Sequence, residues 1–237
     1  MTSFNQSKTS NIGYQIKLDI EQDAINWYEG CNRISKGVDW KQRVPSIVYD
    51  NIFGKSKDAA YKFLIPFLKQ KYVDEKDQID KYISYVDNEY EQNFSLACQK
   101  IASLTDKPLY RKDFTVFLTT FPRGPYNYDM GYLWLVIGRK DPIKNFLHEL
   151  LHFQFIHYWC IPESDVAKLN NEEFEWLKES LTVVLDEDLY PLIKSPDDGY
   201  ELHREFRKEL HKVWKTNKNF DELVKFGLKA LPSFIIK

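Results

Sequence analysis

Two histidines and a glutamate in one short segment have the residue types and spacing of a metal site. His148, Glu149 and His152 form a His-Glu-x-x-His motif. In a helix, residues four apart lie on one face, one turn from each other, so both imidazoles can bind the same ion. Glu149 lies beside them, within reach of a water molecule on that metal. The spacing therefore predicts a Zn2+ site with a general base.

The surroundings of the motif favour a metal over a purely structural role. Asp141 followed by Pro142 predicts the start of a helix, which should run to about Trp159. This helix is apolar around most of its circumference, so we expect it to be interior. Two imidazoles and a carboxylate placed there are costly unless something satisfies them. A divalent ion in a polar cleft would do so. The alternative is a buried helix whose histidines are satisfied by the protein.

A catalytic zinc site usually has three protein ligands and one water molecule, so a further ligand must come from elsewhere in the chain. His157 is the nearest candidate, five residues after His152. That spacing points its side chain away from the face of the motif.

The segment that runs from Trp176 to Asp186, WLKESLTVVLD, offers Glu179. With this segment the chain resembles the gluzincin metallopeptidases, the thermolysin and aminopeptidase group, over residues 112–187. In that family a second helix after the HExxH helix carries a zinc-binding glutamate. The resemblance implies a zinc site with these members: ligands His148, His152 and Glu179, and general base Glu149.

Two further acids of the same region are open to more than one interpretation. Glu172 is nearer to the motif and is a rival ligand, although an acidic residue in the first turn of a helix needs no metal to explain it. The aminopeptidase branch also has a carboxylate seven residues after its ligand glutamate, a place that Asp186 matches. On a helix predicted over residues 171–186, Glu179 and Asp186 share a face. Asp186 could therefore bond to the ring nitrogen of a ligand imidazole that does not bind the metal, and so hold the ring in place. An exposed acid at the end of a helix is the alternative.

A group that stabilises the oxyanion should follow later in the chain. We favour His203 together with Tyr200, near the start of a helix after the turn of residues 196–199. The alternative for each of them alone is an ordinary surface residue of that helix. The other side chains with suitable chemistry are Tyr190, His211, Arg204 and Arg207, and the two arginines could clamp a carbonyl or pair with neighbouring glutamates.

The elements predicted around these residues are helices on both sides of a small sheet. Alternating apolar residues and runs of β-branched and aromatic residues indicate strands, and apolar residues at steps of three and four indicate helices. The predicted strands cover residues 12–20, 114–121 and 131–137. The predicted helices cover residues 59–71, with a break or kink at Pro66, and residues 74–104, 200–215 and 220–231.

This pattern predicts an α+β fold that is mostly helical. The resemblance adds a zincin-like arrangement, in which a small mixed sheet packs on the HExxH helix and an edge strand above the metal binds an extended peptide. Residues 114–121 and 126–134 are both candidates for that strand. We expect an N-terminal strand and helical region over residues 1–111 and a zincin-like catalytic core over residues 112–237, unless the whole chain is one compact domain.

Composition excludes several other functions. A net charge of −2 over 237 residues offers no basic surface for nucleic acid. The longest apolar run is far below the roughly 18–20 residues of a membrane span, and the polar first twenty residues lack the order of a signal peptide. Three widely spaced cysteines form no disulfide framework. We therefore expect a cytoplasmic protein with no membrane or nucleic-acid partner.

These observations predict a zinc-dependent hydrolase, a metallopeptidase that cleaves a peptide or protein substrate by Glu149-assisted attack of a zinc-bound water. The alternative is a catalytically silent zincin-like module that binds a peptide or a partner protein through the same cleft.

Overall fold

The computed structural model describes residues 12–33 and 38–235. In this part of the chain helices predominate and the strands form a four-stranded mixed sheet, so the predicted mixed, helix-rich class is confirmed. The chain divides into two compact units, which we call the sheet unit and the helical unit. The sheet unit comprises Met1–Glu89 and Asp113–Lys140, and the helical unit comprises Tyr90–Lys112 and Asp141–Lys237.

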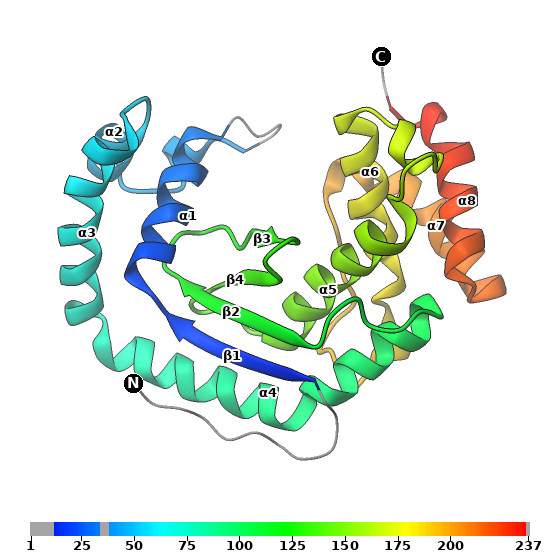
Figure 1. Cartoon of the computed structure of the whole chain (residues 1–237), viewed down its shortest axis with the longest axis horizontal. Coiled ribbons are helices and arrows are strands. Elements are labelled where there is room, and N and C mark those ends of the chain that lie inside the picture. Colours follow the sequence, from blue (N-terminus) through cyan, green and yellow to red (C-terminus); the bar gives the residue numbers. More distant parts are fainter. Residues whose placement is uncertain (1–11, 34–37, 236–237) are drawn as a thin grey trace. The chain divides into compact units, whose positions relative to one another are not determined.

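The sheet unit contains the strands in the order β1-β2-β4-β3 (Figure 1). Their bounds are β1 (Gly13–Leu18), β2 (Asp113–Thr119), β3 (Tyr126–Asn127) and β4 (Tyr132–Val136). β1, β2 and β4 run parallel, with Val116 opposite both Ile16 and Leu133, whereas β3 is antiparallel to β4. The three predicted strands are confirmed. Because β2 is bonded on both sides, residues 114–121 are not an edge strand; of the two candidates, only the stretch 126–134 reaches an edge, through β3.

Among its described residues, the sheet unit also contains three α-helices and the first part of a fourth. They are α1 (Ile20–Asn32), α2 (Ser46–Ile52), α3 (Lys57–Asp74) and α4 (Lys76–Thr105), which continues into the helical unit. Apolar side chains of α1, α2 and α3 pack around Phe121 in one core. Gly30 makes this packing possible, because a Cβ at that position would lie 2.1 Å from the Phe121 ring.

The helix α3 continues through Pro66, so of the two expected outcomes, a break or a kink, the helix shows no break. Proline removes one backbone hydrogen bond from a helix interior and costs roughly 3 kcal/mol there. Pro66 is exposed, which leaves the unbonded carbonyl accessible to water. Leu64 and Leu68 on the same helix are fully buried, and each contributes about 1.5–3 kcal/mol. Tertiary packing therefore offsets the local penalty.

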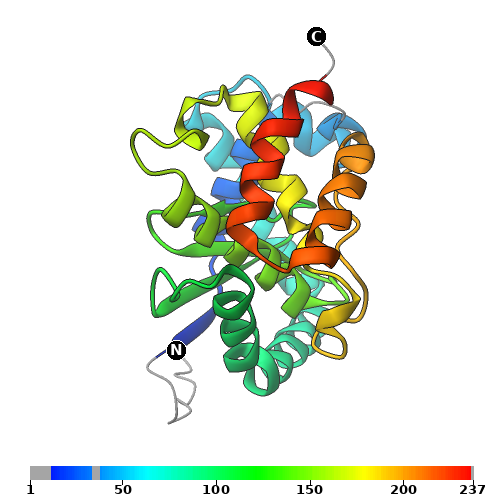
Figure 2. The same ribbon diagram turned by 90° about the vertical axis from the view of Figure 1, so that its right-hand side faces the viewer.

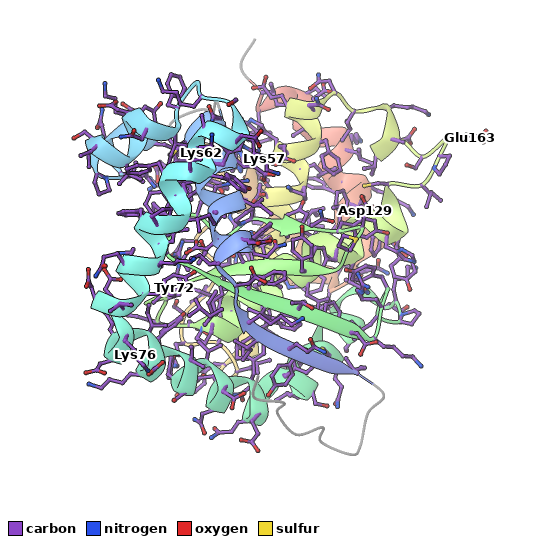
Figure 3. The ribbon with its side chains drawn as sticks, turned by 60° about the vertical axis from the view of Figure 1, so that its left-hand side comes forward. Lys57, Lys62, Tyr72, Lys76, Asp129 and Glu163 are labelled. Atoms are coloured by element: carbon purple, nitrogen blue, oxygen red, sulfur yellow. The ribbon has the colours of Figure 1, made fainter. Side chains whose placement is uncertain are left out.

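A buried carboxylate links three elements of the sheet unit. Asp23, on α1, accepts hydrogen bonds from the hydroxyls of Thr119, Thr120 and Tyr72 and from the Thr120 amide. Tyr72 reaches it from α3 and is labelled in Figure 3. Burial raises the pKa of Asp23, against the effect of these hydrogen bonds. The network joins α1 and α3 to the end of β2.

Among its described residues, the helical unit contains the later part of α4 and four further α-helices, which Figure 2 shows from the side. Their bounds are α5 (Pro142–Trp159), α6 (Asn171–Leu181), α7 (Arg204–Asn217) and α8 (Phe220–Ala230). Phe146 of α5 packs on Tyr90 and Phe94 of α4, at ring-centroid distances of 5.6 and 5.0 Å. The helices α6, α7 and α8 contact one another. Each helix confirms a predicted one.

The ends of α5 and α6 fix the positions of the helices that carry the predicted site residues. Asp141 caps α5, because its carboxylate accepts the Lys144 amide at 3.0 Å, as the Asp-Pro sequence predicts. The helix α6 begins with a capping box between Asn170 and Glu173. It ends at Leu181 and passes into the short 3-10 helix η3 (Thr182–Val184). The prediction of a continuous helix to residue 186 is therefore wrong.

Candidate metal centre

The helix α5 presents His148 and His152 on one face, as the motif predicts. Most of its other side chains are buried, and His152 itself is only 1% exposed. The side chain of His148 is 22% exposed, so the pair lies where the buried part of the helix meets solvent. The two Nε2 atoms face each other at 2.9 Å. A helix with this apolar surface holds both imidazoles in place through its own packing.

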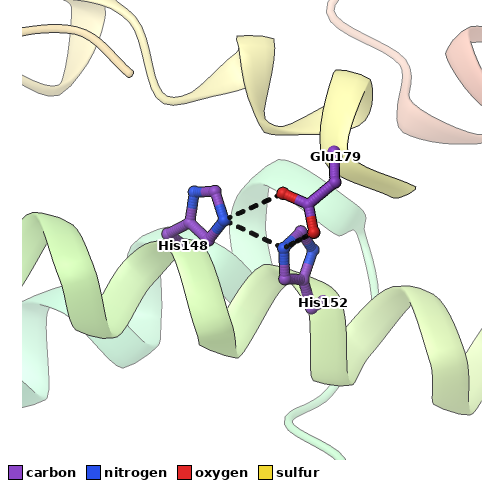
Figure 4. Close-up of side chains that lie close together, drawn as sticks. All are labelled: His148, His152 and Glu179. Carbon is purple, nitrogen blue, oxygen red and sulfur yellow. Dashed lines mark hydrogen bonds and ion pairs between the residues drawn. The ribbon is translucent and has the colours of Figure 1, made fainter. Parts of the chain in front are cut away.

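Glu179, on α6, completes a cluster of three side chains. Its Oε2 lies 3.4 Å from Nε2 of His148, and its Oε1 lies 3.3 Å from Nε2 of His152. Figure 4 shows the carboxylate aimed between the two rings. The three residues can offer one ligand atom each within a 4.8 Å separation. The residue that the family resemblance points to is thus brought to the motif.

The donor set and its spacing fit a zinc ion. Zinc binds imidazole nitrogens and carboxylate oxygens at about 2.0–2.2 Å, and a tetrahedral arrangement at that radius places ligand atoms roughly 3.3–3.5 Å apart. The two nitrogen-to-oxygen distances of 3.4 and 3.3 Å are close to this spacing, although each imidazole faces a different oxygen of the carboxylate, and the nitrogen-to-nitrogen distance of 2.9 Å is somewhat shorter. His148, His152 and Glu179 therefore offer three ligand atoms at a separation compatible with one metal ion.

Asp197 is a member of the site, although its sequence context indicates only a turn. Its Oδ2 lies 2.5 Å from Nδ1 of His148. A carboxylate on Nδ1 directs Nε2 of the same ring toward the metal position. Although burial opposes both effects, Asp197 raises the pKa of His148, and His148 together with Arg207 lowers the pKa of Asp197 to about 2. The imidazole is thus oriented by an ionised acid.

Glu149 and Lys178 place opposite charges beside the three ligands. Glu149 is 7% exposed, and burial raises the pKa of its carboxyl to about 7. The ammonium of Lys178, which is 4% exposed, lies 3.2 Å from Oε1 of Glu179 and 2.9 Å from Oε2 of Glu175. Against the effect of burial, the imidazoles of His152 and His148 and this ammonium hold the pKa of Glu179 far below its usual value.

The residues predicted as oxyanion stabilisers differ in burial and in their neighbours. His203 is 7% exposed, and its ring packs on Trp176 of α6 at a centroid distance of 4.5 Å. Burial lowers the pKa of His203, which keeps the imidazole neutral. Tyr200 is 57% exposed, with its ring 5.6 Å from His203. His211 instead lies at Asp186, with 3.5 Å between Nε2 and Oδ2.

Asp186 does not join the predicted zinc site. Because α6 ends at Leu181, the two-turn spacing from Glu179 does not apply. The Asp186 carboxylate pairs with Lys215 at 3.1 Å and with Lys218 at 3.6 Å, within a second cluster that includes Glu187 and His211. The ammonium groups of both lysines neutralise this carboxylate, so the cluster is a network of ion pairs. Asp197 holds the ligand imidazole instead.

The other two side chains weighed as metal ligands lie elsewhere. Glu172 is exposed in the first turn of α6, where the Asn170 side chain caps its amide. Seven residues, about two helical turns, separate it from Glu179. His157 is exposed near the end of α5, beside the rings of Tyr110 and Tyr158. The cluster at the motif therefore takes its acid from residue 179.

Comparison of the chain with models of protein families, with curated proteins and with solved structures finds no match in any of the three. In residues 12–33 and 38–235, no helix has both the length and the apolar character needed to cross a membrane.

Proposed function

We propose that this chain is a zinc-dependent hydrolase that cleaves peptide bonds. The observation that carries the proposal is the meeting of His148, His152 and Glu179, with ligand atoms 2.9–3.4 Å apart, beside the buried carboxylate of Glu149. Three ligands with a fourth position left open are the arrangement of catalytic rather than structural zinc. The resemblance of residues 112–187 to gluzincin metallopeptidases supports the same chemistry.

Zinc bound by these residues would supply a Lewis acid that acidifies water and polarises a carbonyl. Glu149 accepts one proton from the attacking water as its oxygen bonds to the carbonyl carbon. The carboxyl of Glu149 then gives that proton to the amine nitrogen as the carbon–nitrogen bond breaks. The carboxylate is regenerated, and the water has been divided between the two products.

His203 is suited to stabilise the negative oxygen of the tetrahedral intermediate. Its imidazole is neutral and buried against α6, the helix that carries Glu179. Its Nδ1 has no hydrogen-bond partner among the described residues. A neutral ring can donate an N–H to a developing oxyanion. Tyr200 lies beside His203 in an exposed position, where its side chain can contact bound substrate.

A zincin-like arrangement would bind substrate as an extended peptide along an edge strand. An unstructured peptide or protein segment is therefore the proposed substrate. The proposed location is the cytoplasm, where cysteines stay reduced, since Cys31, Cys98 and Cys160 are all free thiols.

Metal analysis and one substitution test the proposal. Purified protein should contain one zinc per chain and hydrolyse an unstructured protein such as casein. Glu149→Gln should retain the zinc and lose about 10²–10⁴-fold in rate, since the amide keeps the shape of the side chain but accepts no proton. A chain that never holds stoichiometric zinc contradicts the proposal. Stoichiometric zinc with peptide binding but no Glu149-dependent hydrolysis would instead show the silent binding module.

A further inference from the structure

Arg207 is a buried cation whose position the proposed chemistry leaves unexplained. It lies in the first turn of α7 and is only 5% exposed. A guanidinium is always charged and has five N–H donors, so its burial requires several acceptors. The acceptors of Arg207 come from two separate segments, and each of these segments holds part of the candidate metal centre.

One set of acceptors lies at the end of α6. The Nη1 of Arg207 donates to the Glu179 carbonyl at 3.0 Å, to the Ser180 carbonyl at 3.5 Å and to the Thr182 hydroxyl at 2.7 Å. The last carbonyls of a helix have no partner within the helix and carry partial negative charge. Arg207 therefore caps α6 at the residue that presents the ligand carboxylate.

The other set of acceptors is Asp197. The Nη2 of Arg207 donates to the Asp197 carbonyl, and it lies 3.5 Å from Oδ1 of the same residue. The remaining carboxylate oxygen, Oδ2, is the atom that contacts Nδ1 of His148. Asp197 is thus held on one side by the guanidinium and holds the imidazole on the other.

The turn around Asp197 is shaped to fit the guanidinium. Gly199 has a φ of +63°, and a Cβ there would lie 2.6 Å from Cζ and Nε of Arg207. The positive φ favours glycine, and the close approach allows no larger side chain. The backbone of this turn at Gly199 therefore packs directly against the Arg207 guanidinium.

We propose that Arg207 is a positioning residue of the zinc centre, setting Glu179 and His148 relative to each other. This inference rests on the proposed function. The guanidinium acts on Glu179 through the end of α6 and on His148 through Asp197. Both terminal nitrogens are bonded within the protein and the side chain is buried, so Arg207 acts through these residues and not on substrate. Lysine cannot replace it, because its single ammonium cannot bond both segments as the two terminal nitrogens of the planar guanidinium do.

The test measures the zinc dissociation constant by competition with a chelator. Arg207→Lys should weaken zinc binding by roughly 10–100-fold, the usual effect of removing a group that orders a metal ligand. Arg204→Lys is the matched control, since it makes the same change three residues earlier on an exposed side chain that pairs with Glu201. This control should keep the affinity of the wild-type protein.

Two further measurements separate positioning from a general loss of stability. Because Arg207 acts in part through Asp197, the double variant Arg207→Lys with Asp197→Asn should lose less affinity than the product of the single losses. Cobalt(II) bound in place of zinc should show a visible spectrum altered by Arg207→Lys and unchanged by Arg204→Lys, because the spectrum reports ligand geometry.

If Arg207→Lys does not fold, Gly199→Ala carries the same prediction, because it displaces the guanidinium and keeps its charge.

Wild-type zinc affinity and an unaltered cobalt spectrum in folded Arg207→Lys would overturn this inference and leave the proposed hydrolase intact. Strictly multiplicative losses in the double variant would also overturn it. Wild-type protein that binds no zinc would overturn both proposals.

Discussion

Asp197 and His148 are in direct contact, with Oδ2 2.5 Å from Nδ1, although 49 residues separate them in the chain. The contact leaves Nε2 of His148 facing Glu179 and His152. A side chain from a surface turn thereby sets the orientation of a residue on a buried helix. This relationship leads to the first of five predictions.

Asp197→Asn should weaken zinc binding by about tenfold or more, because the amide keeps the size of the side chain but loses the charge that orients the imidazole. Asp198→Asn is the matched control, since it changes the neighbouring exposed residue of the same turn. Isothermal titration of the metal-free protein with zinc measures both. Equal affinities for the two variants would contradict the assigned role of Asp197.

Glu179→Gln and Glu172→Gln compare the two acids of α6. Glu179→Gln should abolish stoichiometric zinc, because a neutral amide replaces the one anionic ligand of the cluster. Glu172→Gln should keep the zinc content of the wild-type protein, since that residue is exposed two turns away. Elemental analysis of the purified variants decides between them, and zinc retained by Glu179→Gln would remove this residue from the ligand set.

Lys178→Met should tighten zinc binding by at least about tenfold. The Lys178 ammonium lies 3.2 Å from the ligand oxygen of Glu179. Like charges a few Å apart repel by several kcal/mol at an effective dielectric constant of about 20, and methionine removes the charge while filling the same space. Chelator competition measures the change, with the exposed Lys208→Met as control. Weaker zinc binding in Lys178→Met would show that the ammonium supports the site.

His203→Ala should lower kcat/KM by about 10²-fold and leave the zinc content unchanged, because the imidazole would act on the oxyanion and is not a ligand. Steady-state hydrolysis of a peptide substrate and elemental analysis give the two values. Tyr200→Phe is the comparison, and a smaller effect is expected because Tyr200 is largely exposed. Loss of zinc in His203→Ala would show that this residue supports the metal centre instead.

Asp23 should make the stability of the protein depend on pH. Burial raises the folded-state pKa of Asp23, so the folded state binds the proton more tightly than the unfolded state. Its contribution is complete below the ordinary carboxyl pKa of about 3.9 and is lost as pH rises through the folded-state value, at up to about 1.4 kcal/mol per pH unit. The free energy of unfolding in urea, wild type minus Asp23→Asn, should therefore fall as pH rises. Asp58→Asn, a change at an exposed position, is measured as the control, and a flat profile for wild type minus Asp23→Asn would contradict the prediction.

Much of the secondary structure was predictable because its signals are local. Alternating apolar residues in β1 and three- and four-residue steps in α4 follow from the geometry of single elements. The failures lie where tertiary contacts outweigh local preference. Pro66 is held within α3 by the burial of Leu64 and Leu68 on either side of it. The helix α6 ends at Leu181, where the side chain of Arg207 bonds to the last carbonyls.

The sequence by itself determined the pair of imidazoles with a carboxylate beside them, because the pitch of a helix sets the distance between residues four apart wherever that helix packs. Only the tertiary structure decided that residue 179 and not residue 172 supplies the acid, and that Asp197 and not Asp186 holds His148. Arg207 likewise meets Glu179 across 28 residues. Contacts over such separations depend on how helices pack and where turns close, and no periodicity in the chain encodes them.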